Sequence, residues 1–179
     1  LMVPTEILAE QHFINISRLL SGISHATREK NLMSVQLDNL PGPISIGLLL
    51  GSLTKRAKDD LRQRIYRGQV DIIIGTQALI QDSVEIPDLA LVVVDEQHRF
   101  GVMQRASLRK KGPRPHLLAM SATPIPRSLA LTLYGDLDIS IIDELPPGRH
   151  KIRNRLVDPD KREAAYGFVR KEVQAGRQA

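Results

Sequence analysis

Two adjacent carboxylic acids, Asp95 and Glu96, directly follow residues 91–94, which read Leu-Val-Val-Val. A short apolar run rich in β-branched residues predicts a strand buried on both faces, and its carboxyl end is where open α/β sheets bind ligands. Acids at that edge suit a divalent cation on Asp95, bound directly or through water, and a water molecule polarised by Glu96. The alternative is a buried strand followed by an acidic turn that has no chemistry.

Small polar residues follow three other apolar runs in the same way. A glycine in such a turn lets the backbone approach a phosphate closely, and hydroxyl and amide groups can donate to phosphate oxygens without reading bases. Taken singly, each of these segments is also consistent with an ordinary structural turn. The three segments are Gly51-Ser52, Gly75-Thr76-Gln77 and Ser121-Ala122-Thr123.

The hydrophobic pattern predicts alternating strands and helices. Apolar residues at helical spacing follow Thr5, a potential N-cap, and continue to Leu20, while a second predicted helix covers residues 54–67 and is ended by Gly68. The predicted strands are residues 44–50, 70–74, 89–94, 116–120 and 137–142. This alternation predicts an α/β fold with a mostly parallel sheet flanked by helices.

Two features of the first third of the chain give weaker signals. Residues 21–43 contain scattered Leu and Met without a firm period, and we interpret this segment as a surface insertion, an inert loop. His12 falls within the first predicted helix, and we interpret it as a partly buried helix histidine rather than as a ligand of DNA or nucleotide.

The composition limits the class of protein. The chain has 25 Lys and Arg against 20 Asp and Glu, a formal net charge of +5, which favours a polyanionic partner. It contains no cysteine, so disulfides and thiolate metal sites are excluded. No apolar run approaches the ~20 residues of a membrane span, and no signal-peptide pattern is present. We therefore expect a soluble, cytoplasmic protein without a membrane partner.

Five sequence blocks, taken together and in order, resemble the motifs of RecG-like DNA helicases of superfamily 2. The first block, residues 2–12 (MVPTEILAEQH), resembles motif Ia, and the last, residues 121–127 (SATPIPR), resembles motif III. Between them, residues 51–52 resemble the GS motif, residues 75–79 (GTQAL) the TQ motif and residues 95–102 (DEQHRFGV) the Walker B box. The resemblance covers the chain from residue 2 to about residue 150 and implies a RecA-like fold of the P-loop NTPase type.

This resemblance also implies a function and a set of roles. The family remodels branched DNA, such as stalled forks and recombination junctions, as ATP- and Mg²⁺-dependent double-strand translocases in bacteria, where we expect association with the nucleoid. Asp95 would hold Mg²⁺, Glu96 would orient the attacking water, and Gln97 and His98 would link hydrolysis to strand movement. Ser121, Ala122 and Thr123 would couple the nucleotide site to DNA. The residues expected to contact the DNA backbone are Pro4, Thr5, Glu6, Gly51, Ser52, Thr76 and Gln77.

One element of the family is missing from the sequence. A Walker A loop of the form GxxxxGK[ST] lies upstream of motif Ia in such helicases, and this chain contains no Gly-Lys dipeptide. We therefore expect residues 1–148 to form a partial first RecA-like lobe without its Walker A strand and loop. The break at Pro146-Pro147-Gly148 predicts an interlobe linker, and Asp158-Pro159 predicts a helix of the second lobe within residues 149–179. Such a fragment should need the remaining helicase domains in cis and be inactive alone.

Three alternatives remain open from the sequence. The chain could be a catalytically silent lobe that binds DNA or a protein, since the Walker A loop is absent. It could belong to a transcription-repair coupling factor, whose motor shares the DEQHRFGV block and whose partner is RNA polymerase. A metal-dependent phosphoesterase using Asp95 and Glu96 is the third alternative, but that class needs a fuller set of metal ligands than the sequence offers.

Overall fold

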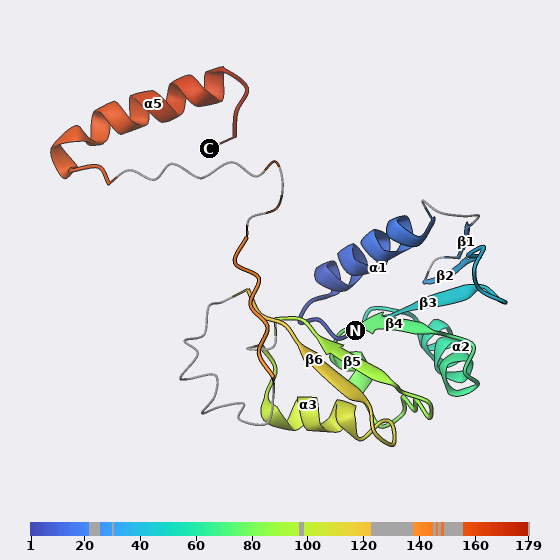
Figure 1. The fold of residues 1–179 in the computed structure, drawn as a ribbon. Coiled ribbons are helices and arrows are strands. Elements are labelled where there is room, and N and C mark those ends of the chain that lie inside the picture. The colour runs from blue at the N-terminus through green and yellow to red at the C-terminus, as the bar shows by residue number, and fades with distance from the viewer. Residues whose placement is uncertain are drawn as a thin grey trace. The chain divides into compact units, whose positions relative to one another are not determined.

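The computed structural model describes residues 1–21, 26–29, 31–96, 99–122, 138–144, 146, 148 and 156–178. It divides the chain into two compact units, Leu1–Ala130 and Leu131–Ala179. The first unit contains all of the strands that the structure describes, and Figure 1 traces both units.

Parallel strands form the centre of the first unit. Strand β3 (Ile44–Leu49) pairs in parallel with β4 (Ile72–Gly75), and β5 (Leu91–Val94) pairs in parallel with β6 (His116–Ala119). Met2 joins the two pairs, because it bridges in parallel to both Gly75 and Val94. Its amide donates to the Val93 carbonyl at 2.8 Å, and the Asp95 amide donates to the Met2 carbonyl at 3.0 Å. The extended start of the chain therefore lies between β4 and β5.

The surface insertion predicted for residues 21–43 is wrong at residues 26–28 and 32–35, where the structure has strands. Strand β2 (Leu32–Val35) pairs antiparallel with β3, and β1 (Ala26–Arg28) pairs antiparallel with β2. Met33 and Val35 are buried, on alternate residues of β2. A four-residue strand offers too few residues for a firm period in the sequence, and its stability comes from pairing with β3 rather than from its own composition.

Helices cover both faces of the sheet. Helix α1 (Glu6–Ser21) buries Ala9 and Phe13 in a cluster with Ile46 of β3 and Ile74 of β4. On the other side, α2 (Lys55–Tyr66) contributes Leu61 and Ile65 to a second cluster, which also contains Leu108 of α3 (Val102–Arg109). Figure 1 shows α1 on one side of the sheet and α2 and α3 on the other. These three layers and the mostly parallel strands confirm the predicted α/β class.

Both ends of α2 have local stop signals, of which the sequence predicted Gly68. The Thr54 hydroxyl accepts a hydrogen bond from the Ala57 amide at 3.3 Å, as an N-cap residue does. Gly68 follows the helix with φ of +68°, in the left-handed region that glycine adopts without a steric penalty. Local chemistry therefore fixes both ends of this helix, which positions the turns on either side of it.

Strand β5 is less evenly buried than its apolar sequence predicted. Val92 and Val94 are buried in the cluster shared with α2 and α3, while Val93 is half-buried and Leu91 is 54% exposed. The strand thus presents one well-covered face and one that the described residues cover only partly. The prediction of a strand buried on both faces is wrong at Leu91, although the strand itself is confirmed.

The second unit contains one long helix among its described residues. A 3₁₀ turn, η3 (Pro159–Lys161), leads directly into α5 (Arg162–Gln174), which confirms the helix predicted after Asp158-Pro159. Residues 138–144 have no regular secondary structure, so the strand predicted for residues 137–142 is wrong over the part that is described. The predicted lobe boundary at residue 148 remains a prediction.

Candidate functional site

Asp95 and Glu96 follow β5 at the carboxyl end of the sheet. The Asp95 Oδ1 accepts a hydrogen bond from the Glu96 amide at 2.9 Å, and the Glu96 carbonyl accepts one from the Arg99 amide at 2.9 Å. Glu96 has φ of +50°, a conformation that non-glycine residues adopt only at an energetic cost. Both side chains are half-buried. The turn therefore holds the two carboxylates at the position where the sequence predicted a nucleotide site.

His12 contacts Asp95 directly. Its Nε2 lies 2.9 Å from Asp95 Oδ2, and the two side chains are 30% and 22% exposed. Because an ionised carboxylate only accepts hydrogen bonds, Nε2 is the donor in this pair. His12 is partly buried on its helix, as predicted, but sequence reasoning missed its partner. The residues are 83 positions apart, and no local spacing signals the contact.

The donor set around Asp95 has consequences for a metal. Among the residues that the structure describes, no three His, Cys, Asp or Glu side chains gather closely enough to form a protein cage for an ion. Mg²⁺ does not need such a cage, since it commonly takes one or two carboxylates and completes its octahedron with water and phosphate oxygens. Each Asp95 oxygen accepts one hydrogen bond and has further acceptor capacity. Asp95 and Glu96 therefore fit Mg²⁺ that arrives with nucleotide phosphates.

The predicted DNA-contacting residues Glu6 and Ser52 lie together. The Glu6 Oε1 accepts a hydrogen bond from the Ser52 amide at 2.9 Å. Hydrogen bonds from the Ser52 side chain and backbone, with a smaller contribution from the nearby charge of Lys58, hold the pKa of Glu6 below its usual range. Glu6 therefore supports the Gly51-Ser52 turn in this structure, and its predicted contact with DNA remains a prediction.

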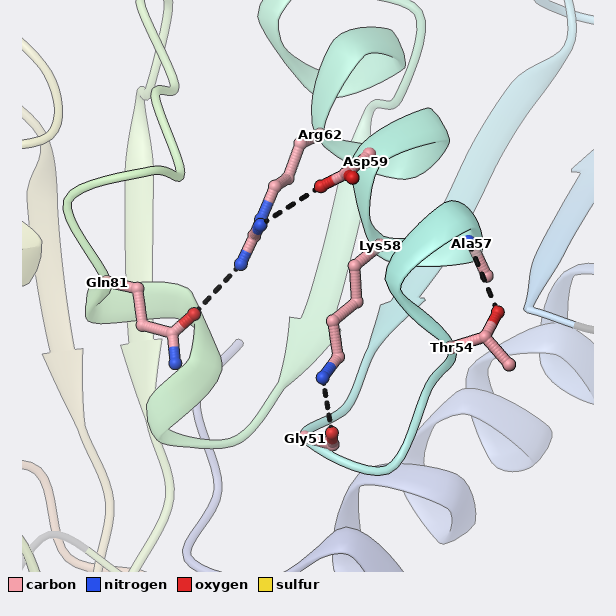
Figure 2. Close-up of polar contacts among 7 residues, drawn as sticks. All are labelled: Gly51, Thr54, Ala57, Lys58, Asp59, Arg62 and Gln81. Atoms are coloured by element: carbon pink, nitrogen blue, oxygen red, sulfur yellow. Dashed lines mark hydrogen bonds and ion pairs between the residues drawn. The ribbon is translucent and has the colours of Figure 1, made fainter.

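Helix α2 holds this turn and the next one along the sheet. Figure 2 shows the Lys58 ammonium donating to the Gly51 carbonyl and the Arg62 guanidinium reaching both Asp59 and Gln81. Gln81 follows η1 (Gln77–Ile80), and the distance from Arg62 to the Gln81 side-chain oxygen is 2.9 Å. Two basic side chains one helical turn apart thereby connect α2 to the segments after β3 and β4.

The turn after β4 and the residues before α1 contain four further predicted site residues, Pro4, Thr5, Thr76 and Gln77. Thr76 precedes η1 in an extended conformation and is half-buried, whereas the Gln77 side chain is exposed. The Thr5 hydroxyl accepts a hydrogen bond from the Leu8 amide at 3.3 Å and so caps α1. Pro4 lies in the bend between the Met2 bridge and this cap. These residues belong to the same sheet edge as Ser52, and Thr5 and Gln77 are the exposed ones among them.

The segment after β6 lies beside the acids. The Met120 amide donates to the Val94 carbonyl at 2.8 Å, so residue 121 follows one position beyond the level of Asp95 on the neighbouring strand. Ser121 is half-buried and Ala122 is exposed. Three predicted site residues, Thr123, Gln97 and His98, lie outside the described residues.

A family model and individual relatives both show that the chain is similar to helicases. The family model described as DEAD/DEAH box helicase matches residues 1–132. The chain is 46% identical over 177 residues to the ATP-dependent DNA helicase RecG of Aquifex aeolicus, covering 98% of this chain and 20% of that relative. It is 46% identical over 179 residues to RecG of Bacillus subtilis, covering 100% and 24% respectively. The chain thus spans about a fifth to a quarter of the length of these relatives.

A solved structure shares the fold. The structure of RecG bound to a three-way DNA junction matches with a TM-score of 0.71 and 41% identity over 98% of this chain and 21% of that chain. This similarity confirms the RecA-like α/β architecture. Within the described residues, no helix is long and apolar enough to cross a membrane.

Proposed function

Because the chain belongs to the DEAD/DEAH box helicase family, we propose that it forms most of the first RecA-like lobe of an ATP-dependent DNA translocase that remodels branched DNA. The named relatives support the RecG branch of the family, since each is a RecG helicase at 46% identity over nearly the whole chain. One of the similar structures is a RecG bound to a three-way DNA junction. In the whole protein, this lobe would act with the remaining helicase domains in cis.

The observation that carries the proposal is the common sheet edge. The Gly51-Ser52 turn, the Thr76-Gln77 turn, the two acids and Ser121 all follow the carboxyl ends of parallel strands. The Met2 bridge to Gly75 and Val94 joins these strands into one sheet. Ligands of open α/β sheets bind at this edge. Groups suited to a nucleotide and groups suited to a DNA backbone therefore occur along a single edge.

The acids would serve the nucleotide. Asp95 would hold Mg²⁺, directly or through water, and Glu96 would orient the water that attacks the γ-phosphate of ATP. The ion would supply charge neutralisation at the phosphates, and most of the catalysis would come from positioning and electrostatics. Gln97 and His98 would link this step to movement of the DNA strand.

The neighbouring turns would bind the DNA backbone. The exposed Ser52 and Gln77 offer a hydroxyl and an amide, and Gly51 leaves room for close approach of a phosphate. Pro4 and Thr5 would position the start of α1, Glu6 would support the Gly51-Ser52 turn, and Thr76 would complete the edge. These groups contact phosphate and sugar rather than bases, so binding would be largely independent of sequence.

Ser121, Ala122 and Thr123 would couple the two ligands. Short hydroxyl side chains can exchange hydrogen-bond partners without repacking a core. The position of Ser121 beside the acids, one strand away, supports this role. The protein would act in the bacterial cytoplasm, associated with the nucleoid, and would require no membrane partner.

The test is phosphate release from Mg-ATP by the full-length protein, with and without DNA. We expect three-way junction DNA to stimulate hydrolysis more than linear duplex of equal length. Glu96→Gln should abolish the stimulated rate, whereas Glu85→Gln, at an exposed position before β5, should match the wild type. Hydrolysis that is absent under all conditions, together with retained DNA binding, would instead favour the silent binding lobe.

A further inference from the structure

Helix α1 contacts two segments that the proposed function assigns to different ligands. Near its start, Glu6 accepts a hydrogen bond from the Ser52 amide at 2.9 Å. Six residues later, His12 Nε2 lies 2.9 Å from Asp95 Oδ2. Six residues of α-helix rise about 9 Å. One short stretch of helix therefore joins a turn suited to DNA phosphate with the carboxylate suited to magnesium.

The helix between these contacts is firmly packed. Ala9 and Phe13 have 0% and 1% of their surface exposed, in a cluster with Ile46 and Ile74 of the sheet. The residues preceding α1 are also fixed, because the Val3 amide donates to the Gly75 carbonyl at 3.0 Å. A helix held in this way moves as one body. A displacement of α1 at Glu6 would therefore also displace His12.

The contact of His12 determines the direction of the Asp95 carboxylate. The Glu96 amide fixes Oδ1 and His12 fixes Oδ2, so the two hydrogen bonds together define the plane of the carboxylate. Groups that orient a metal ligand through a hydrogen bond commonly change metal affinity or activity about 10- to 100-fold when they are removed. His12 is therefore placed to act on the metal without touching it.

The contact of Glu6 is placed to respond to DNA. The Ser52 amide, a natural donor to a phosphate at this edge, already donates to the Glu6 carboxylate. An amide has a single hydrogen, so a phosphate that binds the Ser52 amide replaces or shifts Glu6. The negative charges of phosphate and carboxylate also repel each other. Binding of DNA at this turn would therefore displace the Glu6 carboxylate, which α1 carries in its first turn.

We propose that His12 positions Asp95 for the metal, and that α1 transmits to this pair the shift of Glu6 that occurs when a DNA phosphate binds the Gly51-Ser52 turn. The inference rests on the proposed function and identifies an internal link between its two ligand sites. His12 is a positioning residue in this link, and Glu6 is its sensor for DNA.

The first test observes the link without measuring activity. In full-length protein labelled with ¹⁵N-histidine, the His12 imidazole signal, assigned by its loss in His12→Gln, should report an Nε2 proton. We expect Asp95→Ala to shift it, and three-way junction DNA to shift it in the wild type and in Glu10→Gln but not in Glu6→Gln. Glu10 is the matched control, since it is exposed on the same helix. A His12 signal that is indifferent to Asp95→Ala or to DNA would overturn the inference.

The second test uses DNA-stimulated ATP hydrolysis. His12→Ala should lower kcat about tenfold and raise the Mg²⁺ concentration needed for half-maximal rate, while KM for ATP changes by less than about twofold. His12→Gln, whose amide nitrogen can donate from a similar position, should restore part of the rate. His116→Gln is the control, because His116 is an exposed histidine at the start of β6. A His12→Ala variant equal to this control would overturn the positioning role.

A double-mutant cycle separates the link from two independent effects. Glu6→Gln and His12→Gln should change the DNA stimulation by less together than the product of their separate effects, because they break the same path. Effects of separated sites normally combine independently, so simple multiplication would overturn the transmission through α1. If the wild type shows no DNA-stimulated hydrolysis at all, the proposed function fails. If DNA stimulates ATP hydrolysis by the wild type and the His12 variants respond in the same way, only this inference fails.

Discussion

Gly75 lies opposite Leu49 in the parallel pairing of β4 with β3, so close that a β-carbon on Gly75 would sit 2.3 Å from the Leu49 carbonyl oxygen. The obstacle is backbone, which cannot rotate away. This contact explains why the strand that leads to Thr76 and Gln77 ends in glycine.

Gly75→Ala should therefore destabilise the protein strongly. Because the strands must separate to admit the methyl group, we expect the free energy of unfolding to fall by about 3 kcal/mol. Urea unfolding followed by circular dichroism would measure the change. Gly42→Ala is the control, since a β-carbon there meets no atom within 4 Å, and its effect should stay within about 0.5 kcal/mol. Equal effects of the two variants would contradict the prediction.

Lys111 connects the end of α3 to the loop before β5. Its ammonium donates to the carbonyls of Gln81 at 2.6 Å and Val84 at 2.8 Å, and burial lowers its pKa. Lys111→Met keeps the aliphatic stem but leaves both carbonyls without this donor, so we expect a loss of about 1 kcal/mol. For a chain of this size the melting temperature should fall by roughly 3 °C. Lys110→Met, at the exposed neighbouring position, should melt like the wild type.

Glu6 should contribute stability that depends on pH. Its pKa is lowered in the folded state, so its contribution is fully present above the unfolded pKa of about 4.3 and is lost as the pH falls through the folded value. Glu6→Gln should melt slightly below the wild type at pH 7, and the difference should disappear as the pH approaches the folded pKa. Melting curves from pH 7 to pH 3 would measure this. A difference between Glu6→Gln and the wild type that stays constant from pH 7 to pH 3 would refute this contribution of the Glu6 carboxylate.

Ser17 offers a stabilising substitution. It is 7% exposed within α1, and its hydroxyl finds no hydrogen-bond partner among the residues that the structure describes. Ser17→Ala removes this buried polar group and improves helix propensity, so we expect a gain of about 1 kcal/mol. Ser107→Ala is the matched control, because the Ser107 hydroxyl donates to the Met103 carbonyl at 2.9 Å. A gain for both variants would show that helix propensity alone is responsible.

Glu96 should show a conflict between stability and activity. Its φ of +50° is better tolerated by asparagine than by glutamate. Glu96→Asn should therefore retain or slightly raise the melting temperature while it abolishes DNA-stimulated ATP hydrolysis. Parallel thermal melts and phosphate-release assays would measure both. A variant that loses stability along with activity would show that the left-handed conformation of Glu96 costs little.

Much of this fold was predictable from local sequence. Thr54 and Gly68 mark the ends of α2 because capping chemistry acts over three or four residues. The strands that precede Ser52, Thr76 and Asp95 are apolar runs of ordinary length, so their carboxyl ends, and with them most of the candidate site, could be located in advance.

The remainder depends on contacts between distant parts of the chain. Strand β2 gains its structure from pairing with β3, and its four residues are too few to show a period. The pairing of His12 with Asp95 joins residues 83 positions apart, and the contact of Glu6 with Ser52 joins residues 46 apart. No pattern in a single sequence reports which helix residue meets which turn.

The position of Met2 between β4 and β5 also bears on how the protein folds. Residues 1–3 are synthesised before their hydrogen-bonding neighbours, which lie at about residues 73–75 and 93–95. The middle of the sheet therefore closes only after the chain has been made as far as Asp95, and closure of such long loops is slow. Until then the β4 edge is open to pairing with other chains. We expect aggregation during synthesis, rather than weakness of the finished fold, to limit the yield of this protein.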